Sequence, residues 1–379
     1  MGWKKIENMI QTSGDWSNFV RKIPNTTPED AMRFVFAHPK EEITFFFYVR
    51  NTVNLETPLA NEHGPFETGM AVFFKGQAAI TSSLQCDIYE KKPIATIYIN
   101  PLSNQQFLDI KNYVLAKMTP SPAIDVVCIF AGNFVTDTRP MLRAHNNPHA
   151  TAQFNSNIQM VLDSGYIKQL QNQGITVLLT IMAGHTQTGW SQFADQSTAQ
   201  SFVDYLKTEV VTLYGLDGID IDDEYSIGTI HNDSLAMVTT LMKQAMPNKL
   251  ITKALYDDHV YFNTDWNGHH LGLNLDYGWE MTYYDGDINS RLHFYTGKGM
   301  SKSQLCIGFS AEDQFSKKWQ YTSSQASEVI REKYGGGMMF NFEHQPRSIK
   351  LMKTVVNAMC GPGSWKTIGS IRRRRCSIL

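Results

Sequence analysis

Eight short apolar runs, separated by stretches with helical spacing, constrain the fold of this chain most strongly. They span residues 93–99, 125–131, 175–182, 216–222, 250–256, 276–284, 304–310 and 336–342. Buried strands that alternate with helical segments are typical of βαβ units and a parallel sheet. Eight such units predict an α/β fold, a closed (β/α)8 TIM barrel, in which active sites lie at the carboxyl ends of the strands.

The segments between the strands differ in how clearly they predict helices. Residues 197–215 carry apolar side chains at helical spacing, with Ser197 or Thr198 as the expected cap and Gly215 as the stop. Asp233 is expected to open another helix. Residues 257–275 show no apolar period, so the helix after the fifth strand is expected to be missing.

The first 90 residues follow a different pattern. Thr26, Thr27 and Pro28 predict the start of a helix, and residues 42–50 and 69–81 predict strands. We therefore expect three parts. Residues 1–90 form a small α+β module of unknown role, residues 91–362 form the barrel, and residues 363–379 form a basic tail.

The composition is that of an ordinary soluble globular protein. With 34 basic and 36 acidic residues the net charge is −2, which gives no global attraction to nucleic acid. No signal peptide or membrane-spanning run is evident, and neither a metal nor a cofactor is predicted. No metal-like spacing links the five cysteines, which are Cys86, Cys128, Cys306, Cys360 and Cys376. This pattern favours reduced thiols and therefore an intracellular protein.

Acidic residues crowd the fourth predicted strand between positions 217 and 224. Strand side chains alternate, so Asp220, Asp222 and Glu224 share one face, which in a barrel points toward the axis, with Glu224 at the mouth. Carboxyl groups this close cannot all ionise, so at least one pKa should be raised, as a general acid requires. The alternative is a divalent-metal site or a solvated acidic turn. A metal would favour ligands from other strands, and no other strand end shows a comparable cluster.

Aromatic residues beside an acid end the sixth predicted strand, at residues 279–285. Aromatic rings stack on pyranose faces, and a phenol can hydrogen-bond a substrate carbonyl, so this run favours a sugar site. Packing of aromatic residues at the barrel rim is the alternative.

Together the two runs resemble glycoside hydrolase family 18, whose fourth strand carries Asp-x-x-Asp-x-Asp-x-Glu and whose sixth carries Met-x-Tyr. Both patterns are complete here, at Asp217, Asp220, Asp222 and Glu224 and at Met281 and Tyr283. Within that family, residues 154–165, 174–185 and 214–226 look like bacterial endo-β-N-acetylglucosaminidases that cut high-mannose N-glycans. The resemblance covers roughly residues 93–360.

The resemblance implies a substrate-assisted mechanism. Glu224 would donate a proton to the glycosidic oxygen, while Asp222 would orient and support the 2-acetamido group, whose carbonyl attacks the anomeric carbon. Tyr283 would hydrogen-bond that carbonyl, and Asp220 would modulate Asp222 by sharing its proton. The residues themselves agree, because no second catalytic carboxylate is evident across the barrel. Further candidates for glycan binding at the mouth, each of which could equally be structural, are Asn133, Trp279, Tyr284 and Asn341.

The implied activity is hydrolysis of the GlcNAc-β1,4-GlcNAc bond, with an N-linked glycan or another GlcNAc-containing oligosaccharide as the binding partner. A chitinase-type hydrolase is an alternative, disfavoured because family chitinases usually carry an aromatic residue where this chain has Asp223. A non-hydrolytic glycan-binding protein on the same fold is another. The intact Glu224, Asp222 and Tyr283 argue against it.

The last nine residues carry a separate signal. Arg372–Arg375 precede Cys376-Ser377-Ile378-Leu379, which fits a prenylation box in which the final Leu favours geranylgeranyl. The arginines would supply a second membrane signal through anionic lipid. We expect a host prenyltransferase as partner and a peripheral position on the cytoplasmic face of a eukaryotic membrane, as for an effector delivered by an intracellular bacterium. A disordered basic tail with an accidental cysteine is the alternative.

Overall fold

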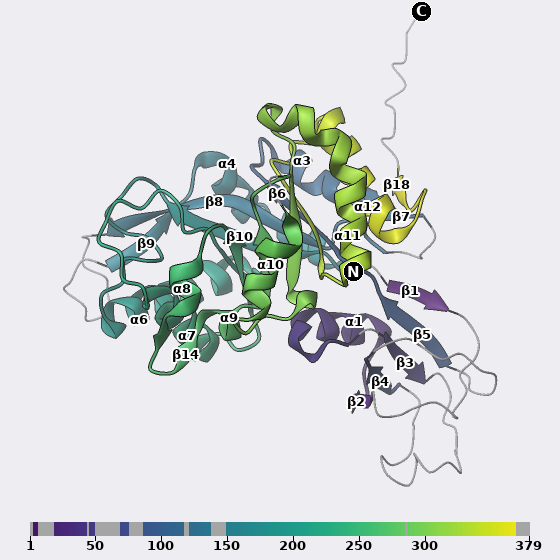
Figure 1. The fold of residues 1–379 in the computed structure, drawn as a ribbon, viewed down its shortest axis with the longest axis horizontal. Helices are drawn as coiled ribbons and strands as arrows, with labels where there is room; N and C mark the ends of the chain where they lie inside the picture. Colours follow the sequence, from purple (N-terminus) through teal and green to yellow (C-terminus); the bar gives the residue numbers. More distant parts are fainter. Residues whose placement is uncertain are drawn as a thin grey trace, which may run out of the picture.

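The computed structural model describes residues 3–6, 19–43, 45–49, 69–75, 86–116, 121–137, 149–284 and 287–368. Its larger part is a ring of eight parallel strands, which closes through the pairing of β8 with β10 (Figure 1). The predicted barrel and its eight strands are therefore confirmed. In ring order the strands are β6 (Ile94–Ile99), β8 (Val126–Asp137), β10 (Thr176–Ala183), β11 (Gly218–Ile221), β12 (Leu250–Leu255), β15 (Tyr277–Glu280), β16 (Leu305–Ser310) and β17 (Gly336–Phe340).

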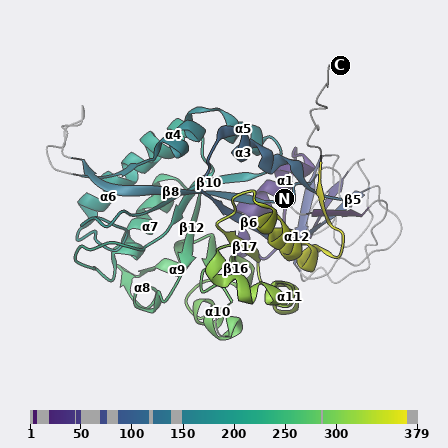
Figure 2. The same ribbon diagram turned by 90° about the horizontal axis from the view of Figure 1, so that it is seen from above.

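Helices surround these strands, as the view from above makes clear (Figure 2). Asp195, rather than Ser197 or Thr198, caps the helix expected near residue 197: its carboxylate accepts the Thr198 N–H at 2.9 Å. Asp233 opens α7 as predicted. The surrounding helices are α3 (Asn104–Leu108), α4 (Ser156–Asp163), α5 (Tyr166–Gln171), α6 (Gln196–Tyr205), its π-helical continuation Leu206–Thr212, α7 (Ser234–Ala245), α10 (Ile288–Thr296), α11 (Thr322–Glu332) and α12 (Pro346–Cys360).

The connection after the fifth barrel strand departs from the ideal barrel, in the place where a missing helix was expected. Instead of one helix of ordinary length it holds two short helices on either side of a small hairpin. These elements are α8 (His259–Asn263), β13 (Asp265–Trp266), β14 (His269–His270) and α9 (Leu271–Asn274).

An antiparallel sheet with the strand order β1-β5-β3-β4-β2 precedes the barrel. Its helix α1 (Pro28–Ala37) starts as predicted, because the Thr27 side chain accepts the Asp30 N–H at 3.1 Å. The predicted strands appear as β3 and β4, although residues 76–81 lie outside the described part. The strands are β1 (Trp3–Ile6), β2 (Phe19–Ile23), β3 (Phe45–Val49), β4 (Ala71–Phe74) and β5 (Cys86–Lys91).

Alternating side chains of the barrel strands face two different cores. One set, which includes Ile219, Ile221 and Ile251, packs outward against the helices. The other set, which includes Tyr277 and Trp279, packs inside the barrel together with residues of α1. Figure 1 shows α1 between the N-terminal sheet and the barrel.

Helix α1 closes the amino-terminal end of the barrel. The Phe36 ring stacks on Tyr277 with centroids 5.2 Å apart, and the Tyr277 hydroxyl donates to the Phe36 carbonyl at 3.1 Å. Burial of a phenylalanine side chain stabilises a fold by about 1.5–3 kcal/mol, so this contact holds α1 firmly to the barrel floor.

The chain remains folded beyond residue 363, where the basic tail was expected to begin. Strand β18 (Trp365–Thr367) pairs antiparallel with β7 (Tyr113–Leu115), and Trp365 is buried. Cys376 and the arginine run lie outside the described residues. Within the described ranges, no helix has the length and apolar character needed to cross a bilayer.

Candidate active site

Asp220 lies inside the barrel and accepts four hydrogen bonds. Thr180 and Thr252 stand beside it in the strand register, and their hydroxyls donate to it at 2.8 and 2.5 Å. The Tyr98 hydroxyl donates at 2.7 Å and the Trp279 indole at 2.9 Å, so that each carboxylate oxygen receives two donors. Burial raises the pKa of Asp220, and these hydrogen bonds oppose that rise.

This arrangement favours the ionised form of Asp220. A carboxylate whose two oxygens each accept two hydrogen bonds is satisfied as an anion. The sharing of a proton between Asp220 and Asp222 stays a prediction. Burial and then the charge of Glu224 are the main causes that raise the pKa of Asp222, and the charge of Asp220 adds to them.

Asp222 sits one step closer to the mouth and is only 4% exposed. Its Oδ1 atom is buried and has no hydrogen-bond partner among the residues that the structure describes. Burial raises the pKa of Asp222 well above its usual value, with Glu224 as the next cause. A buried polar atom without a partner is costly, so this oxygen is suited to receive a donor from a ligand.

Glu224 follows the strand and is half-buried. Burial raises the pKa of Glu224, whereas the Tyr225 hydroxyl and the charge of Lys253 oppose the rise. A carboxyl group that keeps its proton toward neutral pH can act as a general acid.

Tyr283 faces the same acids from the loop after β15. Burial, followed by the charges of Asp222 and Glu224, raises the pKa of Tyr283 well above its usual value, so the phenol stays protonated and can donate. Its ring stacks on Phe340 with centroids 5.8 Å apart. Asp222, Glu224 and Tyr283 therefore lie close enough to affect one another electrostatically, and their catalytic roles stay a prediction.

An aromatic cluster lies at the centre of this mouth. The ring centroids of Phe130 and Phe340 are 5.3 Å apart, and both contact Tyr98, at 5.9 and 6.1 Å. With Tyr283 they form an apolar surface of the kind on which pyranose rings stack. Sequence reasoning missed Phe130 and Phe340. The available signal was an aromatic residue near the carboxyl end of the second and eighth strands.

Two predicted sugar contacts lie elsewhere. Trp279 is 0% exposed, because its place in the strand alternation turns it into the barrel, where it stacks on Tyr277 at 5.6 Å beneath Asp220. Tyr284 is also buried: its ring packs edge-on to Phe309, and its hydroxyl lies 3.1 Å from that of Thr322. Neither ring can receive a glycan in this arrangement, so both predictions are corrected.

Asn133 and Asn341 remain candidates for glycan contact. Asn133 is exposed on β8, where that strand pairs with β10 on one side and with β9 (His149–Gln153) on the other. Asn341 directly follows β17, is half-buried, and has a φ of 57°. Both are near strand ends at the mouth, and their contact with a sugar stays a prediction.

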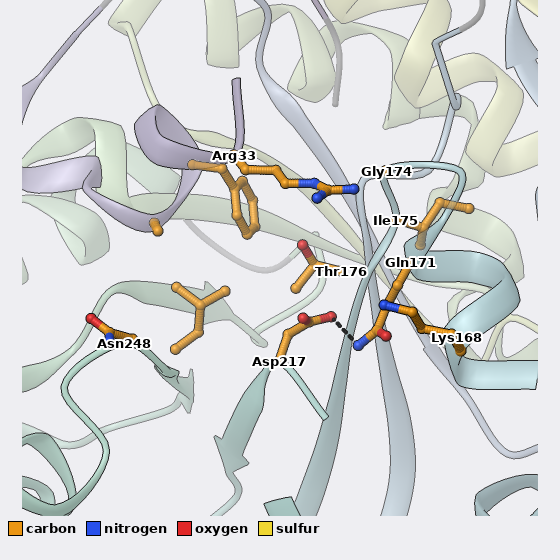
Figure 3. Close-up of a pocket in the computed structure, with 11 residues that line it drawn as sticks. Arg33, Lys168, Gln171, Gly174, Ile175, Thr176, Asp217 and Asn248 are labelled. Carbon is orange, nitrogen blue, oxygen red and sulfur yellow. Dashed lines mark hydrogen bonds between the residues drawn. The ribbon is translucent and has the colours of Figure 1, made fainter. Parts of the chain in front are cut away.

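Asp217 lies at the opposite end of its strand. Its carboxylate accepts the Val177 N–H at 2.8 Å. It also accepts the Gln171 amide at 3.0 Å (Figure 3). It lines a pocket of about 220 Å³ between α1 and the barrel, together with Arg33 and Lys168. The first aspartate of the motif therefore ties β10 and α5 to β11, away from the mouth.

A family model described as the endo-β-N-acetylglucosaminidase EndoS TIM-barrel domain matches residues 118–336. The chain belongs to this family. The endo-β-N-acetylglucosaminidase F1 of Elizabethkingia meningoseptica is 28% identical over 306 residues, which cover 78% of this chain and 82% of that protein. An endo-β-N-acetylglucosaminidase of Flavobacterium sp. (strain SK1022) is 31% identical over 200 residues, which cover 50% and 59%.

Solved structures show the same fold at low identity. EndoBT-3987 of Bacteroides, solved with a Man5GlcNAc product, aligns with a TM-score of 0.55 and 17% identity over 97% of this chain and 91% of its own. A fungal endo-β-N-acetylglucosaminidase of glycosyl hydrolase family 18 aligns with a TM-score of 0.52 and 11% identity, over 71% and 98%. The chain is a glycoside hydrolase by its family, and the fold likeness agrees.

Two further carboxyl groups of this endo-β-N-acetylglucosaminidase-family barrel lie near the acids in sequence or in space. Glu280 points to the outer layer, where it accepts the Arg291 guanidinium at 3.1 Å and the Thr282 N–H at 2.8 Å. Glu312, which sequence reasoning missed, follows β16 and accepts the Ser310 hydroxyl at 3.3 Å. Its charge helps to raise the pKa of Tyr283. Within the described residues, no three His, Cys, Asp or Glu side chains are arranged to hold a metal.

Proposed function

We propose that this endo-β-N-acetylglucosaminidase cleaves the GlcNAc-β1,4-GlcNAc bond of N-glycan cores by substrate-assisted retaining catalysis. The observation that carries the proposal is the convergence of Glu224, Asp222 and Tyr283 over an apolar floor. Support for the substrate comes from the relatives, since EndoBT-3987 has been solved in complex with a Man9GlcNAc2Asn substrate.

In the first step Glu224 donates its proton to the glycosidic oxygen, and the C1–O bond breaks as the acetamido carbonyl oxygen bonds to C1. The buried Oδ1 of Asp222 accepts the acetamido N–H, and the Tyr283 hydroxyl donates to the acetamido carbonyl. In the second step Glu224 takes a proton from water, which attacks C1 and reopens the oxazolinium ring. Two displacements at C1 retain its configuration.

The experiment is digestion of a high-mannose glycoprotein, followed by mass spectrometry for a single N-acetylglucosamine left on asparagine. We expect cleavage by the wild type and a loss of about 10²–10⁴-fold in the Glu224→Gln variant. Glu209→Gln is the matched control, because Glu209 is exposed on the helical segment 206–212. A glycoprotein that the wild type leaves intact would refute the proposal. Conversion of a chitin oligomer alone would favour the chitinase alternative, and tight binding without turnover would favour a glycan-binding protein.

We also propose that Cys376 is prenylated by a host enzyme and that the arginine run reinforces attachment to the cytoplasmic face of a host membrane. The support is the sequence Arg372–Arg375 followed by Cys-Ser-Ile-Leu. Expression in mammalian cells of the wild type and of Cys376→Ser, followed by membrane fractionation, tests this. Equal membrane fractions for the two proteins would contradict it.

For residues 1–90 we propose a supporting role at the floor of the barrel. The support is the contact of α1 with Tyr277, which lies at the end of the barrel opposite to Glu224.

A further inference from the structure

A lysine lies buried in the outer layer of the barrel, directly behind the acids. Lys253 occupies β12 between Ile251 and Leu255, both of which belong to the apolar core that faces the helices. It is 2% exposed. Its ammonium donates to Asp258 at 2.7 Å and to the Ala254 carbonyl at 2.8 Å. A buried ammonium is costly unless it is paired, so a specific environment holds this charge.

Asp258 holds that ammonium in a fixed place. Its second oxygen accepts the Tyr256 N–H at 2.9 Å, and its side chain is almost completely buried. Both carboxylate oxygens are therefore occupied, one by Lys253 and one by the backbone of the loop after β12. Because both partners are buried, solvent screens the pair little.

Asp223 connects this pair to the strand that carries the acid. Strand alternation puts Asp223 on the outer face, opposite to Asp222 and Glu224. Its carboxylate accepts the N–H and the hydroxyl of Ser191, at 3.2 and 3.1 Å, from the loop after β10. Ser191 and Asp223 therefore join the loops after β10 and β11. In the strand register Lys253 of β12 lies beside Ile221 of β11, the residue directly before Asp222.

Several charged groups face Lys253 from these elements. The charge of Lys253 opposes the effect of burial on the pKa of Asp222, Asp223, Glu224 and Asp258. For the pKa of Lys253 itself, burial is the largest cause and lowers it, but the three aspartates outweigh burial and raise it, so the ammonium stays charged. The other titratable groups around the cluster are Asp220, Tyr225, Tyr261, Tyr283 and Glu312.

We propose that Lys253 is a positioning residue for this reaction. Its ammonium, which Asp258 fixes in place, supplies a positive charge that stabilises the ionised forms of Asp222 and Glu224. The inference rests on the proposed function, in which Glu224 transfers a proton and Asp222 accepts the acetamido N–H. The proposal predicts opposite effects on the two acids when Lys253 or Asp258 is neutralised. Removal of the cation destabilises the ionised acids, whereas removal of its partner Asp258 leaves an excess of positive charge and stabilises them.

The experiment compares pH profiles of kcat/KM for glycoprotein cleavage. For Lys253→Met we expect both limbs to move to higher pH by about one unit, and for Asp258→Asn to lower pH by a similar amount, as for the gain or loss of one nearby charge. Lys253→Arg keeps the charge and should keep the wild-type profile. A purely structural role would lower activity in both neutral variants without moving their profiles in opposite directions.

Two further measurements keep the test decisive. The double variant Lys253→Met with Asp258→Asn removes the pair without leaving a lone buried charge, so it should fold. Its pH profile of kcat/KM should lie close to that of the wild type. Titration of the ¹³C-labelled Glu224 carboxyl by NMR needs no substrate, so it separates failure of this inference from failure of the proposed function. Folded Lys253→Met and Asp258→Asn variants whose Glu224 titrates as in wild type would overturn the inference.

Discussion

The indole N–H of Trp279 donates a 2.9 Å hydrogen bond to Oδ1 of Asp220 inside the barrel. This contact fixes a satisfied anion directly below Asp222, and the charge of that anion helps Asp222 to retain a proton. The packed interior of the barrel and the chemistry at its mouth are thereby joined through one buried carboxylate.

Tyr98→Phe tests the importance of that anion, since it removes one of the four donors and leaves the ring in place. We expect the free energy of unfolding to fall by about 1.5–3 kcal/mol at neutral pH, as for a lost hydrogen bond to a charged group. The loss should shrink in acid, where Asp220 is protonated. Urea unfolding at several pH values measures it, and a pH-independent loss would point to packing instead.

Asp222→Asn should stabilise the protein while it lowers activity. Burial raises the folded-state pKa of Asp222, so its contribution to stability is fully present below the unfolded value near 4 and is lost as the pH rises through the folded pKa. Asparagine does not ionise, so the variant does not lose this stability as the pH rises. At pH 8 we expect a gain of at least about 1.4 kcal/mol, the equivalent of one pKa unit, and no gain near pH 4. If the variant differed from the wild type by the same free energy of unfolding at pH 4 and at pH 8, Asp222 would carry no proton in the folded state.

Tyr283→Phe and Tyr284→Phe form a matched pair, because they remove the same hydroxyl from adjacent positions. We expect Tyr283→Phe to lower kcat by about 10²-fold, the size of one lost transition-state donor, with little change in stability. Tyr284→Phe should leave kcat unchanged and lower the free energy of unfolding by about 1 kcal/mol, since its hydroxyl pairs with Thr322. Steady-state kinetics with thermal unfolding separates the two, and the reverse pattern would contradict this assignment.

Asp217→Ala tests whether the first aspartate of the motif is structural. It leaves the buried Val177 N–H without its acceptor, which should cost about 1–3 kcal/mol of stability and leave kcat/KM unchanged. Asp217→Asn retains an acceptor oxygen and should cost less. A large fall in kcat/KM in a variant of unchanged melting temperature would return Asp217 to the active site.

Local patterns in the sequence were enough to predict the barrel and its row of acids. Apolar runs marked the eight strands, because a strand buried on both faces must be apolar throughout. Strand alternation put Asp220, Asp222 and Glu224 on one face. The helix starts at Thr27 and Asp233 also followed from nearby residues.

Only the tertiary structure decided which of the remaining candidates meet at the mouth. Tyr283 and Tyr284 both have positive φ, and they pack in different places: Tyr283 stacks on Phe340 at the mouth, whereas Tyr284 packs on Phe309 in the outer core. Phe130 and Phe340 come from distant strands that only barrel closure brings together. The pairing of Lys253 with Asp258 likewise depends on how a loop folds back on its strand. Periodicity determines which face a side chain takes, and three-dimensional packing determines what that face meets.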